Sequence, residues 1–211
     1  MDIHSFETLP STQAYLIEAI RQRQWTAPVA VIAEEQTDGH GSRGNRWEGG
    51  NGNLLTSVAV RMEDLPDDLP LQSASIYAGW LMRQSLRNAG ESVWLKWPND
   101  LYTDANKVGG IITQKVQETL VIGIGVNLKN VSQDYTSLQS PLTPVILLNM
   151  FLERLQRYPK WKQIFSQYAI EFELSRAFSA HQGRTQIDLQ HAHLLEDGSI
   201  EINGERIHSL R

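Results

Sequence analysis

A glycine-rich segment that also carries arginines is the part of the sequence best suited to binding an anion. Residues 38–47 read DGHGSRGNRW and follow an apolar run. The glycines let backbone N–H groups approach phosphate oxygens, because no Cβ stands in the way. Arg43 and Arg46 add planar guanidinium donors, and Trp47 offers a flat face on which a base could stack. The alternative is a loop that only turns the chain, with Trp47 pinning it down.

Further motifs downstream carry a candidate cation and a candidate carboxylate. They read KWPND at residues 96–100, NKVGGI at 106–111 and GIGVN at 123–127. Lys107 is a compact cation that could neutralise a carboxylate and a phosphate as they come together. Asp100 could orient or deprotonate an attacking amine. The simpler interpretations are a surface lysine beside a turn and an Asn-Asp turn after Pro98.

This order of segments resembles the catalytic domain of biotin protein ligases, which activate biotin with ATP and transfer it to a lysine of an acceptor protein. The resemblance carries specific motifs from Ser11 to about Asn127. It implies ATP, biotin and Mg²⁺ as ligands, with the metal held mainly through phosphates. It implies a biotin carboxyl carrier protein as partner and leaves a homodimer open.

The resemblance also implies a set of site residues, with no residue assigned to a metal. The expected catalytic residues are Lys107, Asp100 and Arg43. The residues expected to contact biotin are Ser11, Thr12, Gln13, Gln36, Gly39, His40, Gly109 and Gly110. The residues expected to contact the nucleotide are Gly41, Ser42, Arg43, Arg46, Trp47, Asn99 and Asn127.

The loop departs from the family pattern in its charge. The family usually has GRGRRGR, whereas residues 39–45 here read GHGSRGN. His40, Ser42 and Asn45 stand where arginines are usual, so fewer fixed charges face the phosphate. We therefore expect the adenylate to be held less tightly than the full-arginine pattern implies.

Composition excludes several other classes of protein. The chain has 211 residues, of which 41% are hydrophobic and 20% charged, as in a globular protein. A net charge of −5 disfavours binding to a nucleic-acid backbone. The absence of cysteine excludes a disulfide scaffold and a thiolate nucleophile. No apolar run approaches the ~20 residues that span a bilayer, so a cytoplasmic location is expected.

The elements that must position these residues follow from periodicity and from turn residues. Ser11 is expected to cap a helix. Strands are expected at 29–33, 54–61 and 92–96, a helix at 72–88, and a hairpin from 108–116 and 120–128. Two helices are expected within 144–175, broken near Pro159. Short β segments with Asp-Gly and Asn-Gly turns follow in 176–211.

These elements predict an α/β (α+β) fold with a mixed, largely antiparallel sheet backed by helices. Residues 1–175 would form the biotin- and ATP-binding catalytic domain, and 176–211 a small SH3-like β domain. Some family members add an N-terminal helix-turn-helix that represses transcription. Because this chain begins just before the Ser-Thr segment, no such domain is expected.

Three other functions stay open at this stage. A lipoate or octanoate ligase would share the general fold. A biotin-binding sensor without transfer activity would be compatible with the arginine-poor loop, although Lys107 argues against it. A nucleic-acid-binding protein has only the basic residues of the loop in its favour.

Overall fold

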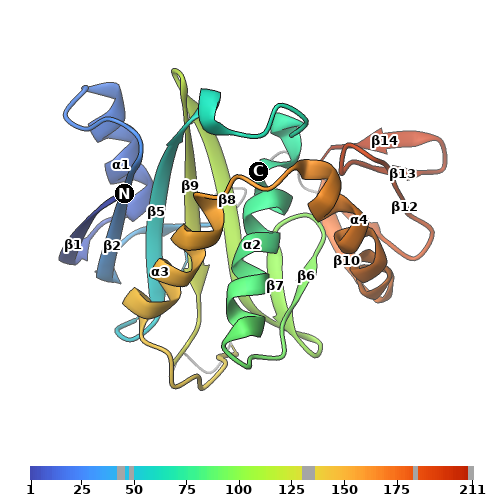
Figure 1. Cartoon of the computed structure of the whole chain (residues 1–211). Helices are drawn as coiled ribbons and strands as arrows, with labels where there is room; N and C mark the ends of the chain where they lie inside the picture. The colour runs from blue at the N-terminus through green and yellow to red at the C-terminus, as the bar shows by residue number, and fades with distance from the viewer. Residues whose placement is uncertain (42–45, 48–49, 130–135, 183–184, 209–211) are drawn as a thin grey trace.

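The computed structural model describes the chain except residues 42–45, 48–49, 130–135, 183–184 and 209–211, and except the side chains of Arg46 and Gln182. Its centre is a seven-stranded sheet in the order β1-β2-β5-β9-β8-β7-β6. The first pair, β1 and β2, is parallel, and every other neighbouring pair is antiparallel. The predicted mixed, largely antiparallel sheet is therefore confirmed (Figure 1).

In the sequence, two strands of this sheet come before the glycine-rich loop and five come after it. Their bounds, in sheet order, are β1 Asp2–Leu9, β2 Val29–Gln36, β5 Leu54–Arg61, β9 Thr119–Val126, β8 Asn106–Val116, β7 Asp100–Thr103 and β6 Trp94–Lys96. A separate two-stranded ribbon, β3 (Gly39–His40) with β4 (Arg46–Trp47), forms the base of the loop.

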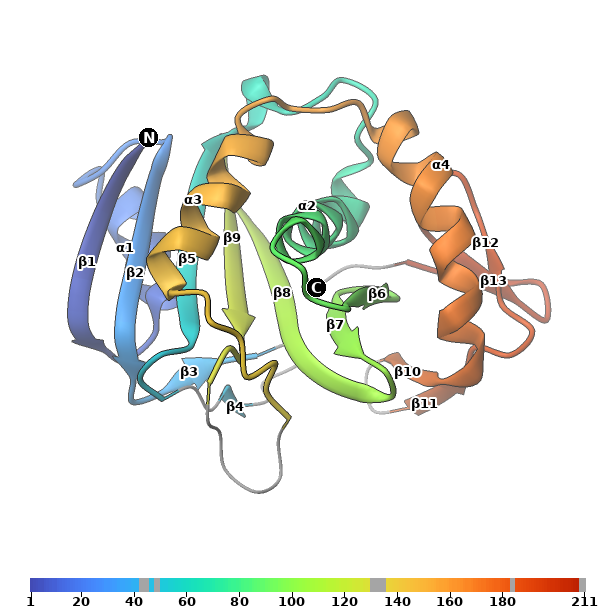
Figure 2. The same ribbon diagram turned by 60° about the horizontal axis from the view of Figure 1, so that its bottom comes forward.

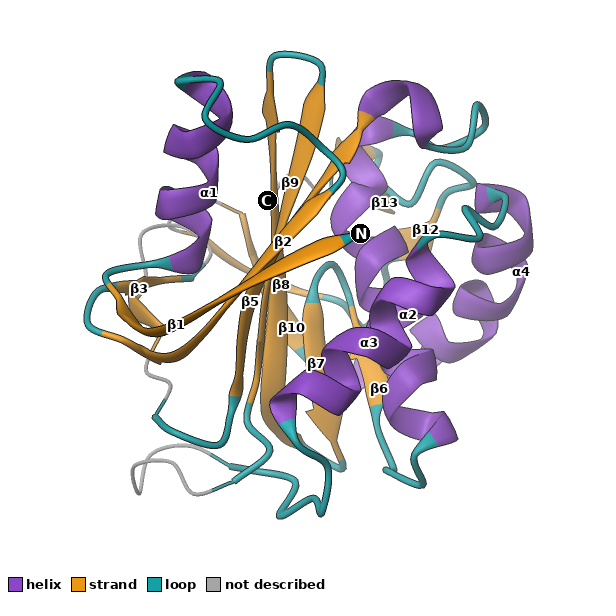
Figure 3. Ribbon diagram, turned by 60° about the vertical axis from the view of Figure 1, so that its left-hand side comes forward, coloured by secondary structure: helices purple, strands orange, loops and turns teal. Residues whose placement is uncertain are grey.

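Helices cover the two faces of the sheet (Figures 2 and 3). On one face α1 (Thr12–Arg21) packs through Leu16, Ile17 and Ile20 against Val29 and Val31 of β2. On the other face lie α2 (Ala74–Asn88) and α3 (Pro144–Leu155), with α4 (Trp161–Glu171) packed beside α2. Alternate residues of the strands thus enter two separate apolar cores.

The local predictions agree with this arrangement. Ser11 caps α1, because its Oγ accepts a hydrogen bond from Ala14 N at 3.3 Å. The hairpin between β8 and β9 turns at Gln117, whose φ is +54°. Among the residues that the structure describes, no helix is long and apolar enough to cross a membrane.

Some strands carry no clear sequence signal. The mixed polar and apolar segment that forms β1, and the Asn-Asp turn pair whose aspartate begins β7, were not predicted as strands. β1 is held by pairing with β2, more than twenty residues later in sequence, whereas β7 pairs with its sequence neighbours β6 and β8 and is hidden by its turn-like residues.

The C-terminal segment forms small β sheets, as predicted. One pairs β10 (Ser179–Gln182) with β11 (Thr185–Asp188), and the other joins β12 (His193–Leu194), β13 (Ile200–Ile202) and β14 (Glu205–Ile207). The apolar pattern of residues 207–210 predicts a last β segment there, whereas β14 begins at Glu205 and ends at Ile207. Buried residues of these sheets belong to the same apolar cluster as α2 and α4. The boundary after residue 175 stays a prediction.

Candidate functional site

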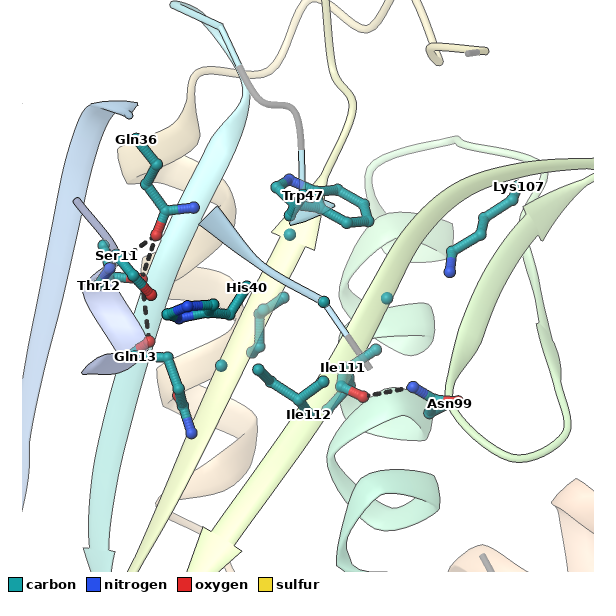
Figure 4. A pocket seen from close by; sticks show the side chains of 16 residues that line it. Ser11, Thr12, Gln13, Gln36, His40, Trp47, Asn99, Lys107, Ile111 and Ile112 are labelled. Atoms are coloured by element: carbon teal, nitrogen blue, oxygen red, sulfur yellow. Dashed lines mark hydrogen bonds between the residues drawn. The ribbon is translucent and has the colours of Figure 1, made fainter. Parts of the chain in front are cut away.

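A cavity lies between the N-terminus of α1, the sheet and the loop ribbon β3–β4 (Figure 4). The cavity and its mouth enclose about 430 Å³. It is lined by residues from both ends of the predicted motif series: Ser11, Thr12, Gln13, Gln36, His40, Gly41, Trp47, Ser57, Asn99, Lys107, Gly110, Ile111, Ile112, Gly123, Ile124 and Gly125. The fold thus brings together segments separated by about half of the chain.

One side of the cavity is a network of uncharged polar groups. Oε1 of Gln36 accepts hydrogen bonds from Thr12 N at 2.7 Å and from Thr12 Oγ1 at 3.0 Å. The same hydroxyl lies 3.0 Å from Oγ of Ser57 on β5. These bonds fix the orientation of Gln36, because its oxygen is committed to Thr12 and its amide nitrogen is turned toward the cavity side (Figure 4).

Gln13 adds an unsatisfied acceptor to the same side. Its side chain is buried, and its Oε1 has no hydrogen-bond partner among the residues described. Gly123 makes room for it, since a Cβ there would lie 2.6 Å from that oxygen. A buried acceptor without a donor is costly, so this atom is ready to receive an N–H from a ligand. We call Thr12, Gln13, Gln36 and Ser57 the neutral wall.

The opposite side carries charges. Nζ of Lys107 lies 2.6 Å from Oδ1 of Asp100, and Nζ of Lys96 lies 4.0 Å from Oδ2 of the same carboxylate. The side chain of Lys96 is 7% exposed, whereas that of Lys107 is 41% exposed. Lys107 is therefore the accessible cation of this group. We call Lys96, Asp100 and Lys107 the charged wall.

Tyr102 borders the charged wall. Lys96 Nζ lies 5.2 Å from the centre of its ring. Burial, and secondarily the charge of Asp100, raise the pKa of Tyr102 to about 12. Its hydroxyl therefore stays neutral even at alkaline pH and contributes no negative charge to the wall.

A β-bulge turns Lys107 toward the cavity. Leu101 pairs with Gly109, but the next residue, Tyr102, pairs with Lys107, so Val108 is an extra residue in β8. One extra residue reverses the alternation of side chains along a strand. Lys107 therefore lies on the cavity side together with Gly110, whereas a regular strand would direct it to the opposite face.

The loop before Asp100 is fastened to the neighbouring strand. Nδ2 of the buried Asn99 donates to Ile111 O at 2.7 Å, and Ile111 N donates to Asn99 O at 2.9 Å. These two hydrogen bonds fix the segment before Asp100 against strand β8. Asn99 thus lines the cavity, but its side-chain amide nitrogen and its backbone carbonyl are already hydrogen-bonded to Ile111. Its role there is structural.

Trp47 covers the cavity from above. Its indole packs against Gly125, where any Cβ would collide with the ring, and its Nε1 is buried without a hydrogen-bond partner in the described part of the chain. Lys107 Nζ lies 5.9 Å from the ring centre. Gly39 is needed beneath the ribbon, because a Cβ there would collide with the backbone of Trp47.

Several expected site residues do not line the cavity. Asp100 is one of them, although its carboxylate pairs with Lys107, which does. A Cβ on Gly109 would lie 2.8 Å from Gly125 O and 3.0 Å from Leu101 Cδ1, so this glycine allows the strands to pack. Gly39 supports the ribbon instead. Asn127 lies beyond β9 and donates to Thr136 O at 3.1 Å. Ser42 and Arg43 fall outside the described residues, as does the side chain of Arg46.

Some cavity residues escaped the sequence-based prediction. They are Ser57, Ile111, Ile112, Gly123, Ile124 and Gly125. Lys96 of the charged wall, which does not line the cavity, was missed as well. Only the glycines had a usable signal, because two glycines at alternate positions of an apolar strand leave one face without side chains. Ser57 lies in an ordinary alternating strand, and nothing near it in sequence marks it as a site residue.

The arrangement suits an elongated ligand with two different ends. A neutral polar head would be recognised at the neutral wall by oriented amide and hydroxyl groups. An anionic tail would meet Lys107 at the charged wall, where an ammonium can offset the repulsion between a carboxylate and a phosphate. The aromatic face of Trp47 closes the space above both.

Comparisons with known proteins agree with this geometry. A family model described as biotin/lipoate A/B protein ligase matches residues 5–129. The bifunctional ligase/repressor BirA of Escherichia coli is 36% identical over 138 residues, 61% of this chain and 42% of that protein. The biotin–[acetyl-CoA-carboxylase] ligase of Mycobacterium tuberculosis is 29% identical over 161 residues, 68% of this chain and 59% of that protein.

These alignments cover less than two thirds of the curated relatives. A solved structure is matched over nearly its whole length: the biotin acetyl coenzyme A carboxylase synthetase of Helicobacter pylori with bound biotinylated ATP. It is 38% identical, has a TM-score of 0.94, and the match covers 98% of this chain and 99% of that one. Because the family model spans more than half of the sequence, the chain belongs to the biotin/lipoate A/B protein ligase family.

Proposed function

We propose that this protein is an ATP-dependent biotin protein ligase, which forms biotinyl-5′-AMP and transfers biotin to a lysine of a biotin carboxyl carrier protein. The observation that carries the proposal is one cavity with the neutral wall at one end and Lys107, paired with Asp100, at the other. The similarity to a synthetase whose structure holds biotinylated ATP supports the same ligand chemistry.

The first step joins two anions. A carboxylate oxygen of biotin attacks the α-phosphorus of ATP, a P–O bond forms, and pyrophosphate leaves with the electron pair of the broken P–O bond. Lys107 would lower the repulsion between carboxylate and phosphate, while Asp100 holds its ammonium in place. The neutral wall would fix the far end of biotin so that the carboxylate approaches in line.

The second step transfers the biotinyl group. The neutral amine of the acceptor lysine attacks the carbonyl carbon of the mixed anhydride, an amide bond forms, and AMP leaves. Asp100, whose carboxylate pairs with the cavity residue Lys107, would orient this amine or accept its proton. Its ion pair with Lys107 would have to loosen for the second role.

The nucleotide would lie between the loop and the charged wall. Trp47 would stack on adenine, and Arg43, Arg46 and the backbone at Gly41 and Ser42 would contact phosphates. Mg²⁺ would arrive bound to the phosphates of ATP, its usual mode in such reactions. Asn127 would act indirectly, by holding the chain beyond β9.

Intact-mass analysis tests the proposal. The protein is incubated with ATP, biotin and a purified carrier domain, and the expected result is a carrier heavier by one biotinyl group. A carrier whose acceptor lysine is replaced by arginine is the control and should not gain mass. Pyrophosphate release without carrier isolates the first step.

The same assay separates the rival functions. Transfer of lipoate or octanoate in preference to biotin would identify the other branch of the family. Biotin binding without pyrophosphate release would identify a sensor. Either result would overturn the assignment of this protein as a biotin protein ligase.

A further inference from the structure

The strand that leads into the charged wall has a free edge. β6 is the last strand of the sheet and is only three residues long, Trp94–Lys96. It pairs on one side with β7, where Lys96 lies opposite Asp100. A strand this short at the edge of a sheet is weakly held by its ladder alone, and its outward N–H groups need partners because they are buried.

Side chains from the last residue of α4 and from the 3-10 helix η4 (Phe172–Ala177) that follows it supply these partners. Leu95 N donates to Oε1 of Glu171 at 2.8 Å, and Trp97 N donates to Oγ of Ser175 at 3.1 Å. Two residues advance a strand by about 6.6 Å, and four residues advance a 3-10 helix by about 8 Å. Glu171 and Ser175 are thus far enough apart along their helices for each to reach one of the two N–H groups.

Both acceptors are themselves buried and fixed. Ser175 is 0% exposed, and the side chain of Glu171 is 10% exposed. Glu171 forms an ion pair with Arg83 of α2, whose Nε lies 3.2 Å from Oε1. Arg83 in turn stacks on Trp80, 4.6 Å from the ring centre. The two acceptors consequently tie the backbone of the edge strand to the packed helices.

The C-terminal turn reaches the same segment. The indole Nε1 of the fully buried Trp97 donates to Gly198 O at 3.0 Å. Gly198 has φ +81° and packs so closely on Ser73 that a Cβ would collide with that side chain. Trp97, the residue after Lys96, is thus fixed twice: its backbone N–H is bound by Ser175 and its indole N–H by Gly198.

We propose that Glu171 and Ser175 are positioning residues for the ligase reaction: they take the place of a missing neighbouring strand and set the position of Lys96 and Asp100. This inference rests on the proposed function. Neither residue touches the cavity, so both act through the backbone of β6. Their loss should affect the charged wall and spare the neutral wall, which is built from other elements.

Ser175→Ala tests this inference. It removes the acceptor of Trp97 N–H and should lower kcat for pyrophosphate release about 10-fold, because small displacements of catalytic groups cost this much. The KM for biotin and its Kd should not change. The amide of Trp97 should exchange its hydrogen faster than in the wild type, measured by hydrogen–deuterium exchange.

Ser85→Ala is the matched control. Ser85 is equally buried, and its hydroxyl donates to Leu81 O within α2 at 2.9 Å instead of accepting from the edge strand. It should leave kcat and the exchange of Trp97 unchanged. If Ser175→Ala does not fold, Ser175→Cys keeps the volume but offers a weaker acceptor, and kcat should again fall.

A folded variant of Ser175 with the kcat of the wild type would overturn the positioning role. An equal loss of kcat in Ser85→Ala would do so too, since it would show a general effect of buried serines. Absence of pyrophosphate release by the wild type would instead overturn the proposed function. In that case the hydrogen–deuterium exchange of the Trp97 amide still tests the structural part of the inference. An unchanged exchange rate in Ser175→Ala would show that Ser175 does not restrain Trp97.

Discussion

The neutral wall and the charged wall of the cavity are stabilised by different means. The neutral wall lies over the centre of the sheet, where Thr12, Gln36 and Ser57 hold one another by short hydrogen bonds. The charged wall lies near the sheet edge, and its carboxylate is shared by Lys96 and Lys107. A neutral head group needs oriented partners, whereas developing charge needs a cation that is already in place.

The comparison also shows where each wall is vulnerable. Hydrogen bonds within the neutral wall are local to α1, β2 and β5. The charged wall depends on a bulge in β8, on a three-residue strand and on side chains from α4. We therefore expect substitutions in the neutral wall to change biotin affinity and substitutions in the charged wall to change the rate.

Lys107→Ala should have the largest effect. Removing the accessible cation should reduce pyrophosphate release by about 10²–10³-fold, the usual cost of losing one group that stabilises a transition state. Biotin affinity measured by calorimetry should change little. Lys115→Ala is the control, since Lys115 lies on the same strand but pairs with Glu118 at the surface, 3.8 Å away. Equal rates in both variants would remove Lys107 from the mechanism.

Gly109→Ala and Gly110→Ala should separate two neighbouring glycines. The first places a methyl group 2.8 Å from a backbone oxygen, and overpacking of this kind costs about 1–3 kcal/mol. The second places it 3.6 Å from Asp100 and Lys107, an ordinary contact. Thermal denaturation should show a lower Tm for Gly109→Ala alone. Similar Tm values would mean that the strands adjust without cost.

Thr12→Val tests the neutral wall. It keeps the shape but removes the hydroxyl that bonds Gln36 and Ser57, a loss of about 1–1.5 kcal/mol. The Kd for biotin should therefore rise about 10-fold, while kcat at saturating biotin is retained. Thr56→Val is the control, because Thr56 is buried and donates to Val31 O outside the cavity. A fall in kcat without a change in Kd would contradict the division between the walls.

Asp197→Asn should have the smallest effect, which should fall on stability and its pH dependence and not on the reaction. Burial alone would raise the pKa of Asp197, but hydrogen bonds from Ser199, Arg206 and Gln72 hold it below its usual value. A lowered pKa contributes stability above about pH 4, which is lost as the pH falls through the folded-state pKa. The variant should lose less stability than the wild type between pH 5 and pH 3, measured by urea denaturation. An identical slope would refute this contribution.

The sequence by itself determined the local elements and the main motifs. The cap at Ser11, the hairpin turn at Gln117 and the break between α3 and α4 follow from residues close together in the chain. The same holds for Lys107 and Asp100, which stand in recognisable motifs and do pair with each other beside the cavity that Lys107 lines. Short-range preferences are enough for such features, because their partners lie within a few residues.

Only the tertiary structure decided which residues face the cavity. The extra residue Val108 turns Lys107 to the cavity side, and the pairing of β8 with β9 assigns Gly110 to the cavity and Gly109 to the sheet interior. Ser57 and Ser175 gained their partners from segments far away in sequence. Strand register and long-range packing set these contacts, and a shift of one residue would reverse every side chain on a strand.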